Sequence, residues 1–162
     1  MAYLLDANVF IEGRKRHYGF DICPGFWDWI DRAIAKGTVR SVEQVGGELE
    51  AGNDELAAWA TARRGSLFLP TDPAMLPSLQ AVSTWVTKQN YTQAAVSKFL
   101  QDADYYLIAR AHAHRDVVVT LENANPTRRN TVPIPNVCIG LGVQFMNPFE
   151  MLRTERVRLV LA

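Results

Sequence analysis

Three acidic side chains occupy positions at which carboxylates could meet in one site. Asp6 directly follows the apolar run 3–5, and Glu122 directly follows the β-branched run 117–121. Glu48 lies one or two helical turns beyond a further strand-like run. The carboxyl ends of parallel strands meet at one edge of a sheet, and open α/β proteins place their working sites there. We therefore expect these three carboxylates to lie near one another.

A fourth acid, Asp104, lies on the apolar face of a predicted helix. At about 100° per residue, Leu100, Leu107 and Ile108 all project within roughly 60° of it. Asp102 projects about 160° away, so we expect it to be the helix N-cap. A carboxylate that faces a core costs several kcal/mol unless it is paired or bound to a metal. The position of Asp104 thus points to a site.

Four converging carboxylates with no matching buried lysine would repel one another and raise one another's pKa values, whereas a divalent cation would stabilise them. Ligation by oxygen alone favours Mg²⁺ or Mn²⁺ over zinc. Such an ion suits hydrolysis of a phosphodiester, because it activates water and neutralises charge on the phosphate. We predict that the catalytic and metal-binding residues are Asp6, Glu48, Asp104 and Glu122.

Strand-like and helical stretches alternate along the chain. Strands are predicted at 3–5, 38–42, 67–69 and 117–121, with a weaker fifth at 136–139. Helices are predicted at 24–36, from a cap at Asn53 to 64, and at 72–90, 92–101 and 102–115. This alternation predicts a three-layer α/β/α sandwich around a parallel sheet of four to five strands. Gly46 and Gly47 each cost a helix about 1 kcal/mol, so we expect the segment that carries Glu48 to be loop-like.

Composition describes one ordinary globular domain. The chain has 162 residues, 17 Lys and Arg against 17 Asp and Glu, and 48% hydrophobic residues. We expect a single domain over 1–152, with 153–162 as a terminal strand or tail. Zero net charge argues against coating nucleic acid by electrostatics alone. The spacing of Cys23 and Cys138 favours neither a zinc site nor a disulfide framework.

The opening apolar run is too short for a signal peptide, so we expect a cytoplasmic protein. The uncharged stretch 130–149 carries three prolines and is not expected to cross a membrane. It is predicted to be a loop followed by a strand.

Short motifs in a fixed order resemble the PIN-domain ribonucleases, specifically the VapC-like toxins of prokaryotic toxin–antitoxin pairs. These motifs are LLDANVFI (4–11), GEL (47–49), ADYYLIARA (103–111) and VVTLE (118–122). They span about 120 residues. The segments YGFDICPGFW (18–27) and PNVC (135–138) are similar to one branch of these toxins.

This resemblance implies a metal-dependent endoribonuclease with Asp6, Glu48, Asp104 and Glu122 as its acidic site. It also implies that Asn8 and Thr120 are polar residues supporting the acids and contributing to substrate binding. The resemblance also implies three partners. They are an RNA substrate, an antitoxin protein that occupies the groove beside the acids, and a second copy of the chain in a homodimer.

The basic run after the first motif, which comprises Arg14, Lys15 and Arg16, could contact RNA phosphates. Its alternative role is a solvated face. Arg128 and Arg129 near Glu122 allow the same two interpretations.

Two other functions fit parts of the pattern. A strand ending in Asp-x-Asn resembles the Asp-x-Asp motif of haloacid-dehalogenase phosphatases, but Asn8 would remove their general acid. A non-catalytic PIN-like protein that binds a partner or RNA is the second alternative, against which the four retained acids argue.

Overall fold

A computed structural model describes residues 1–161 and contains a five-stranded, wholly parallel sheet. The strand order is β3-β2-β1-β4-β5. The strands are β1 (Tyr3–Leu5), β2 (Val39–Val42), β3 (Phe68–Leu69), β4 (Val117–Val119) and β5 (Phe145–Met146). Every residue of β1 and β4 is buried, as expected of apolar central strands in a parallel sheet.

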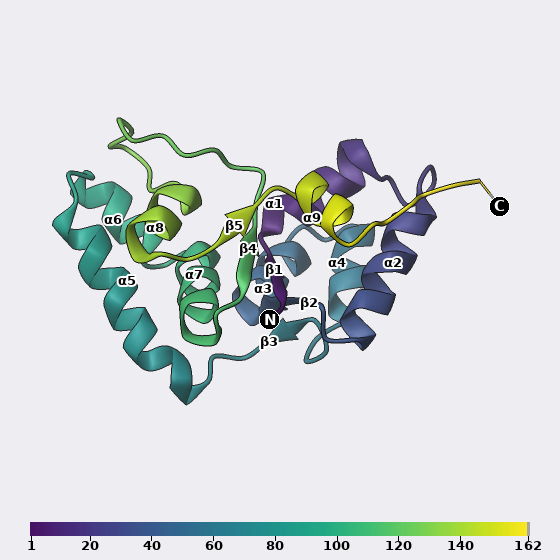
Figure 1. The fold of residues 1–162 in the computed structure, drawn as a ribbon, viewed down its shortest axis with the longest axis horizontal. Coiled ribbons are helices and arrows are strands. Elements are labelled where there is room, and N and C mark those ends of the chain that lie inside the picture. Colours follow the sequence, from purple (N-terminus) through teal and green to yellow (C-terminus); the bar gives the residue numbers. More distant parts are fainter. Residues whose placement is uncertain (162) are drawn as a thin grey trace.

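Helices connect successive strands and cover both faces of the sheet. The α-helices are α1 (Ala7–Glu12), α2 (Pro24–Ala35), α3 (Glu43–Glu50), α4 (Glu55–Thr61), α5 (Leu76–Lys88), α6 (Gln93–Phe99), α7 (Ala103–His114), α8 (Ile134–Leu141) and α9 (Pro148–Thr154). A π-helix follows α1 at Gly13–His17, and a 3₁₀ turn precedes α5 at Pro73–Met75. In Figure 1, α5 to α8 lie on one side of the sheet and α2 and α4 on the other. The expected three-layer α/β/α sandwich is confirmed.

The register of the two central strands places Asp6 beside Thr120. Leu5 of β1 pairs with Val119 of β4, so the next residue of each chain segment leaves the sheet at the same edge. The backbone N–H of Asp6 donates to the carbonyl of Val119 at 3.0 Å. Two segments separated by more than a hundred residues thereby deliver their polar ends to one place.

The strand expected at 136–139 is wrong, because this segment lies within helix α8. Its apolar, β-branched residues favoured a strand, but Ile134, Val137 and Cys138 are buried at helical spacing instead. Gly142 ends the helix with a φ of 69°. The fifth strand is β5, farther along the chain, so the stretch 130–149 holds a helix as well as a loop and a strand.

The C-terminal segment also differs from expectation. Helix α9 runs across residue 152 to Thr154, and its N-cap Asn147 forms a capping box with Glu150. Residues 155–161 form neither helix nor strand, so the expected terminal strand does not occur among them. Residue 162 lies outside the described residues. At α4 the capping side chain is Asp54 rather than Asn53, and it accepts the N–H of Ala57 at 2.9 Å.

Gly46, Gly47 and Glu48 lie inside the regular helix α3, which contradicts the expectation that the segment carrying Glu48 is loop-like. Packing explains Gly46, because a Cβ there would lie 2.8 Å from Cγ of the Phe68 ring. The glycine lets α3 approach β3 closely. A Cβ on Gly47 would meet nothing within 4 Å.

These two glycines predict opposite effects of the same substitution. Gly47→Ala should raise the free energy of unfolding by about 0.5 to 1 kcal/mol, because alanine favours the helix and fills open space. Gly46→Ala should lower it by about 1 to 3 kcal/mol through displacement of Phe68. Urea denaturation of both variants measures the difference. Equal effects at the two positions would contradict the close packing of α3 on β3.

Candidate active site

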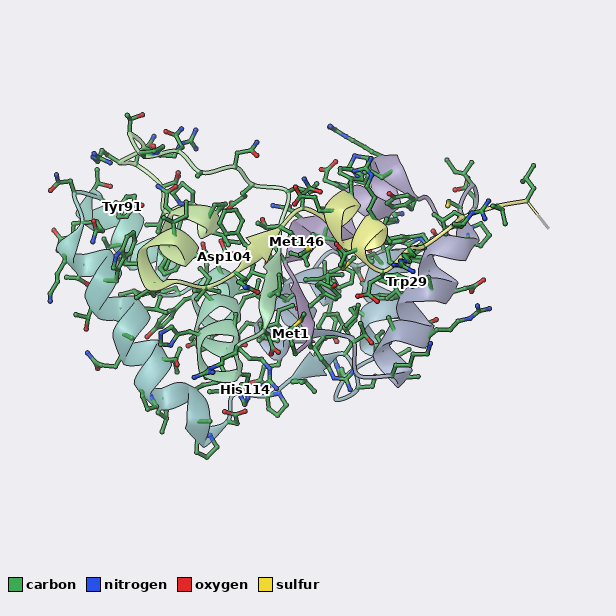
Figure 2. The ribbon with its side chains drawn as sticks, in the orientation of Figure 1. Met1, Trp29, Tyr91, Asp104, His114 and Met146 are labelled. Carbon is green, nitrogen blue, oxygen red and sulfur yellow. The ribbon has the colours of Figure 1, made fainter. Side chains whose placement is uncertain are left out.

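All four predicted acids line one cavity of about 600 Å³ at the carboxyl edge of the sheet. Asp6 enters it from the end of β1, Glu48 from α3, Asp104 from the first turn of α7, and Glu122 from the loop after β4. Figure 2 shows Asp104 toward the upper end of α7, opposite the end that carries His114. The arrangement brings together residues from four separate parts of the chain.

Asp6 is the most deeply buried of these carboxylates, with 3% of its surface exposed. Its Oδ2 accepts a hydrogen bond from the Thr120 hydroxyl at 3.1 Å. Burial, together with the nearby charge of Glu122, raises the pKa of Asp6 to about 7, although the hydroxyl of Thr120 partly opposes this rise. The site therefore holds a carboxyl group whose ionisation is costly without a nearby cation.

The pKa of Asp104 is raised for the same reasons. Burial raises its pKa to about 8, and the charges of Asp6 and Glu122 add to the rise. The prediction that this residue lies on the face of its helix directed toward the interior is confirmed by its partial burial and by its place in the cavity.

Asp102 occupies the N-cap position of α7, as predicted, although its side chain makes no capping hydrogen bond. It lines the acid cavity as a fifth carboxylate and forms an ion pair of 2.7 Å with Lys98. Its charge contributes to the raised pKa of Asp104.

Glu122 is held by one hydrogen bond to its side chain and one from its backbone. Its Oε2 accepts the N–H of Ile134 at 2.8 Å, and its own N–H donates to the Thr120 hydroxyl at 3.1 Å. Burial raises the pKa of Glu122, whereas the Ile134 N–H and the charge of Arg128 lower it. The loop after β4 thus carries the carboxylate in a defined place.

Glu48 is the most accessible of the four acids and projects from helix α3. Partial burial raises its pKa, the charge of Asp102 raises it further, and Lys98 lowers it. Glu43 on the same helix does not line the acid cavity.

The donor chemistry of the cavity fits Mg²⁺ or Mn²⁺. Its acidic side chains are all carboxylates, and the buried Asp6 and the half-buried Asp104 carry raised pKa values that a divalent cation would offset. Within residues 1–161, no group of three or more His, Cys, Asp or Glu side chains has the geometry to hold an ion as it stands.

Comparison with known proteins places the chain in a family. The model of a family described as "Domain of unknown function (DUF4411)" matches residues 3–159. The chain belongs to the DUF4411 family. Searches of curated proteins and of solved structures found no match. In this DUF4411 chain, no helix within residues 1–161 is long and apolar enough to cross a membrane.

The residues predicted to bind substrate have different places in the DUF4411 fold. Asn8 lines the acid cavity. The hydroxyl of Thr120 contacts both Asp6 and the backbone of Glu122, which is the supporting role that the resemblance implies. Thr120 is only 1% exposed, so the direct contact with substrate that was also predicted is not available to it.

The basic run lies outside the acid cavity. Arg14 pairs with Asp54 at 3.3 Å, and Arg16 pairs with Glu12 at 3.2 Å. Lys15 is exposed. The structure therefore does not bring these three cations to the acids.

Further polar residues of the acid cavity were not predicted from the sequence to be part of the site. Gln44 and Gln101 line the acid cavity, as do Asp102 and its partner Lys98. The sequence offered a signal for Lys98, since it stands four residues before Asp102 within helical reach. Gln44 and Gln101 carry no comparable signal.

The buried hydroxyl of Thr120 predicts a measurable loss when it is removed. Thr120→Val should lower the free energy of unfolding by about 1 to 3 kcal/mol, because the N–H of Glu122 and the carboxylate of Asp6 each lose a partner. Urea denaturation measures this change, and Thr120→Ser is the matched control because it keeps the hydroxyl. A valine variant as stable as the serine variant would contradict the bridging role.

Proposed function

We propose that this protein is a Mg²⁺- or Mn²⁺-dependent endoribonuclease that hydrolyses phosphodiester bonds of RNA. The observation that carries the proposal is the convergence of Asp6, Asp104, Glu122 and Glu48 on one cavity, with raised pKa values at all four. Stability does not explain why four like charges lie together, because they repel one another. A cation that binds them and acts on an anionic substrate would explain the arrangement.

The four acids have distinct roles in this proposal. Asp6 and Asp104 are the principal ligands of the ion, because their burial makes them most dependent on a nearby positive charge. Glu122 and Glu48 complete the ligand set from the two sides of the cavity. When bound, the ion would lower the pKa of a water molecule and stabilise the charge that develops on phosphorus and the leaving oxygen.

The remaining polar groups position the acids and the substrate. Thr120 holds Asp6 and the backbone of Glu122 in register, which limits the reorganisation needed for ligation. Asn8 stands on the cavity wall beside Asp6, where its amide can contact the sugar or the phosphate of a bound strand.

The resemblance to VapC-like toxins extends the proposal to partners. We propose that the nuclease is the toxin of a two-protein system, that it acts in the cytoplasm as a homodimer, and that an antitoxin segment inhibits it by occupying the groove beside the acids. The ordered motifs from 4–11 to 118–122 support this assignment.

Regulated expression in a bacterial host tests the nuclease directly. Wild type, Asp6→Asn and Glu43→Gln are induced in parallel, and RNA 5′ ends are sequenced. We expect growth arrest and discrete new ends with wild type and Glu43→Gln, whose altered carboxylate lies outside the acid cavity. Asp6→Asn should produce neither.

New RNA ends that persist in Asp6→Asn would remove the acids from the chemistry. Intact RNA with all three proteins would favour a non-catalytic binding protein.

A further inference from the structure

A second cavity of about 560 Å³ adjoins the acid cavity. The two share the lining residues Lys98, Asp102, Asp104 and Glu122, so they form one continuous groove. The walls of the second cavity come from α6, the start of α7 and the segment 121–133 that follows β4. Figure 1 shows this segment arching away from the sheet toward α6 and α8.

Hydrogen bonds fix the segment 121–133 at several points. The side chain of Asn136 accepts the N–H of Asn125 at 2.8 Å and donates to the Asn125 carbonyl at 2.9 Å. The same amide donates to the Tyr91 hydroxyl at 3.0 Å, and the carbonyl of Arg129 accepts the N–H of Thr92 at 2.8 Å. The second cavity therefore has a preformed wall, which reduces the cost of ordering it around a ligand.

The chemistry of the second cavity changes along its length. Carboxylates stand at the junction with the acid cavity, and two cations, Lys98 and Arg128, are placed close to them. Arg128 is near enough to lower the pKa of Glu122, and its Nη1 donates to the Thr131 hydroxyl at 3.2 Å. This arrangement suits a chain of phosphates that passes from the cations to the acids.

Amide side chains line the same cavity beyond the cations. Asn123 and Asn130 are exposed there, and neither amide is hydrogen-bonded to another side chain or backbone group within residues 1–161. Each offers two N–H donors and a carbonyl acceptor, the groups that read the edge of a base.

We propose that the second cavity binds the nucleotide that flanks the cleaved phosphodiester in single-stranded RNA, with Lys98 and Arg128 contacting phosphate and with Asn123 and Asn130 reading the base. This inference rests on the proposed nuclease function and adds the source of its sequence preference. Proteins recognise RNA sequence through unpaired bases whose edges are accessible. The volume lies within the range of sites for small organic ligands.

Cleavage of a randomised single-stranded RNA pool tests base reading. Sequencing of the products from wild type should show a preference for one base at a position beside the cut. In Asn130→Ala that preference should fall by about tenfold, within the range expected for a lost base contact. Asn90→Ala is the matched control, because this exposed asparagine lies outside both cavities. An unchanged preference in both Asn130→Ala and Asn123→Ala would overturn base reading.

Binding separates this inference from the nuclease proposal. Asp6→Asn protein is titrated with four fluorescein-labelled hexaribonucleotides, one of each base, and the affinities are measured by fluorescence anisotropy. We expect the four affinities to differ, and the difference to collapse when Asn130→Ala is added. Adding Arg128→Ala should weaken all four alike and reduce the salt slope by about 1.

The outcomes of the two arms are distinct. A wild type that leaves the RNA pool intact overturns the nuclease proposal, whereas the binding titration still decides the second cavity. If the hexamers bind Asp6→Asn equally well with and without the added Asn130→Ala or Arg128→Ala substitution, the second-cavity proposal is overturned even if RNA is cleaved. It is also overturned if the hexamers do not bind Asp6→Asn at all.

Discussion

Asp104→Asn is expected to make the protein more stable and nearly inactive. In EDTA above pH 8, the free energy of unfolding should rise by about 3 kcal/mol, because the variant no longer buries a carboxylate among like charges. The rate of RNA cleavage should fall by roughly a thousandfold, which corresponds to about 4 kcal/mol of lost transition-state stabilisation. A gain in stability with a loss of activity distinguishes a functional carboxylate from a structural one.

The pH dependence of this stability gain follows from the direction of the pKa shift. The pKa of Asp104 is about 8 in the folded chain and near its ordinary acidic value when unfolded. Between these values the folded state binds more protons, so the stability of the wild type falls as pH rises. The advantage of Asp104→Asn should therefore be absent near pH 4, grow with pH and level off above pH 8.

Urea denaturation across this pH range measures the difference, and Asp28→Asn serves as the control. Asp28 is exposed on α2 and lies outside the acid cavity, so its substitution should leave the pH profile of the wild type unchanged. A variant Asp104→Asn that is less stable than wild type at every pH would make Asp104 a structural residue held by its surroundings.

The main elements of the sheet could be predicted from the sequence because their signals are local. The run 3–5 is short and apolar, the run 117–121 is mostly β-branched, and an acid follows each, which matches β1 and β4 closely. Pro24 lies at the first turn of α2, and the helix predicted from residue 92 begins at Gln93 with Thr92 as its N-cap.

The errors in the fold arise where tertiary packing decides the outcome. The segment 136–139 contains Val137 and Ile139, whose β-branched side chains favour a strand when they are considered alone. The fold instead buries Ile134 and Val137 in α8, which also supplies the N–H that holds Glu122. Gly46 shows the same effect, since only the neighbouring Phe68 ring explains a glycine inside α3.

The residues of the candidate site likewise divide into those that local geometry predicts and those that only tertiary packing explains. Asp6 and Glu122 were placed by strand ends and Asp104 by the apolar face of its helix, so helical and strand geometry sufficed for them. The ion pair of Lys98 with Asp102 was missed because both side chains can serve a solvated helix surface. Only the packing of α6 and α7 around the acid cavity gives that pair a place at the site.

Thr120 supports the acids, as the resemblance implies, but it does so from a buried position. It contacts both Asp6 and Glu122 and is only 1% exposed. Its single hydroxyl donates to one acid and accepts from the backbone of the other. The two carboxylates from β1 and β4 are thus coupled through one side chain, and we expect both to respond when either gains a cation.

Added Mg²⁺ or Mn²⁺ is expected to stabilise the wild type by mass action. At about 100 times the dissociation constant, an ion that binds only the folded chain adds about 2.7 kcal/mol, which raises the unfolding midpoint by roughly 5 to 10 °C. Asp6→Asn and Asp104→Asn should lose most of this rise, because each removes one of the two principal ligands proposed for the ion. Thermal unfolding with and without the ion measures it.

Competition with protons makes the effect of the metal depend on pH. Because the pKa values of Asp6 and Asp104 are raised, an ion must displace protons from them below neutrality, and its stabilising effect should increase from pH 6 to pH 9. In EDTA the stability of the protein is expected to fall as pH rises, whereas the stabilisation by the metal is expected to grow. Both effects have one cause, because the carboxylates that repel one another without metal are the ligands that attract the ion.

Two substitutions on the same helix separate ligation from general electrostatics. Glu48→Gln removes a carboxylate that lines the acid cavity, whereas Glu43→Gln removes one that does not. Both change the net charge equally, so a metal effect that depends only on overall charge would fall by the same amount in each. We expect the rise in midpoint to shrink in Glu48→Gln and to persist in Glu43→Gln. An identical rise in wild type, Asp104→Asn and Glu48→Gln would place the ion elsewhere and remove the acid cavity from metal binding.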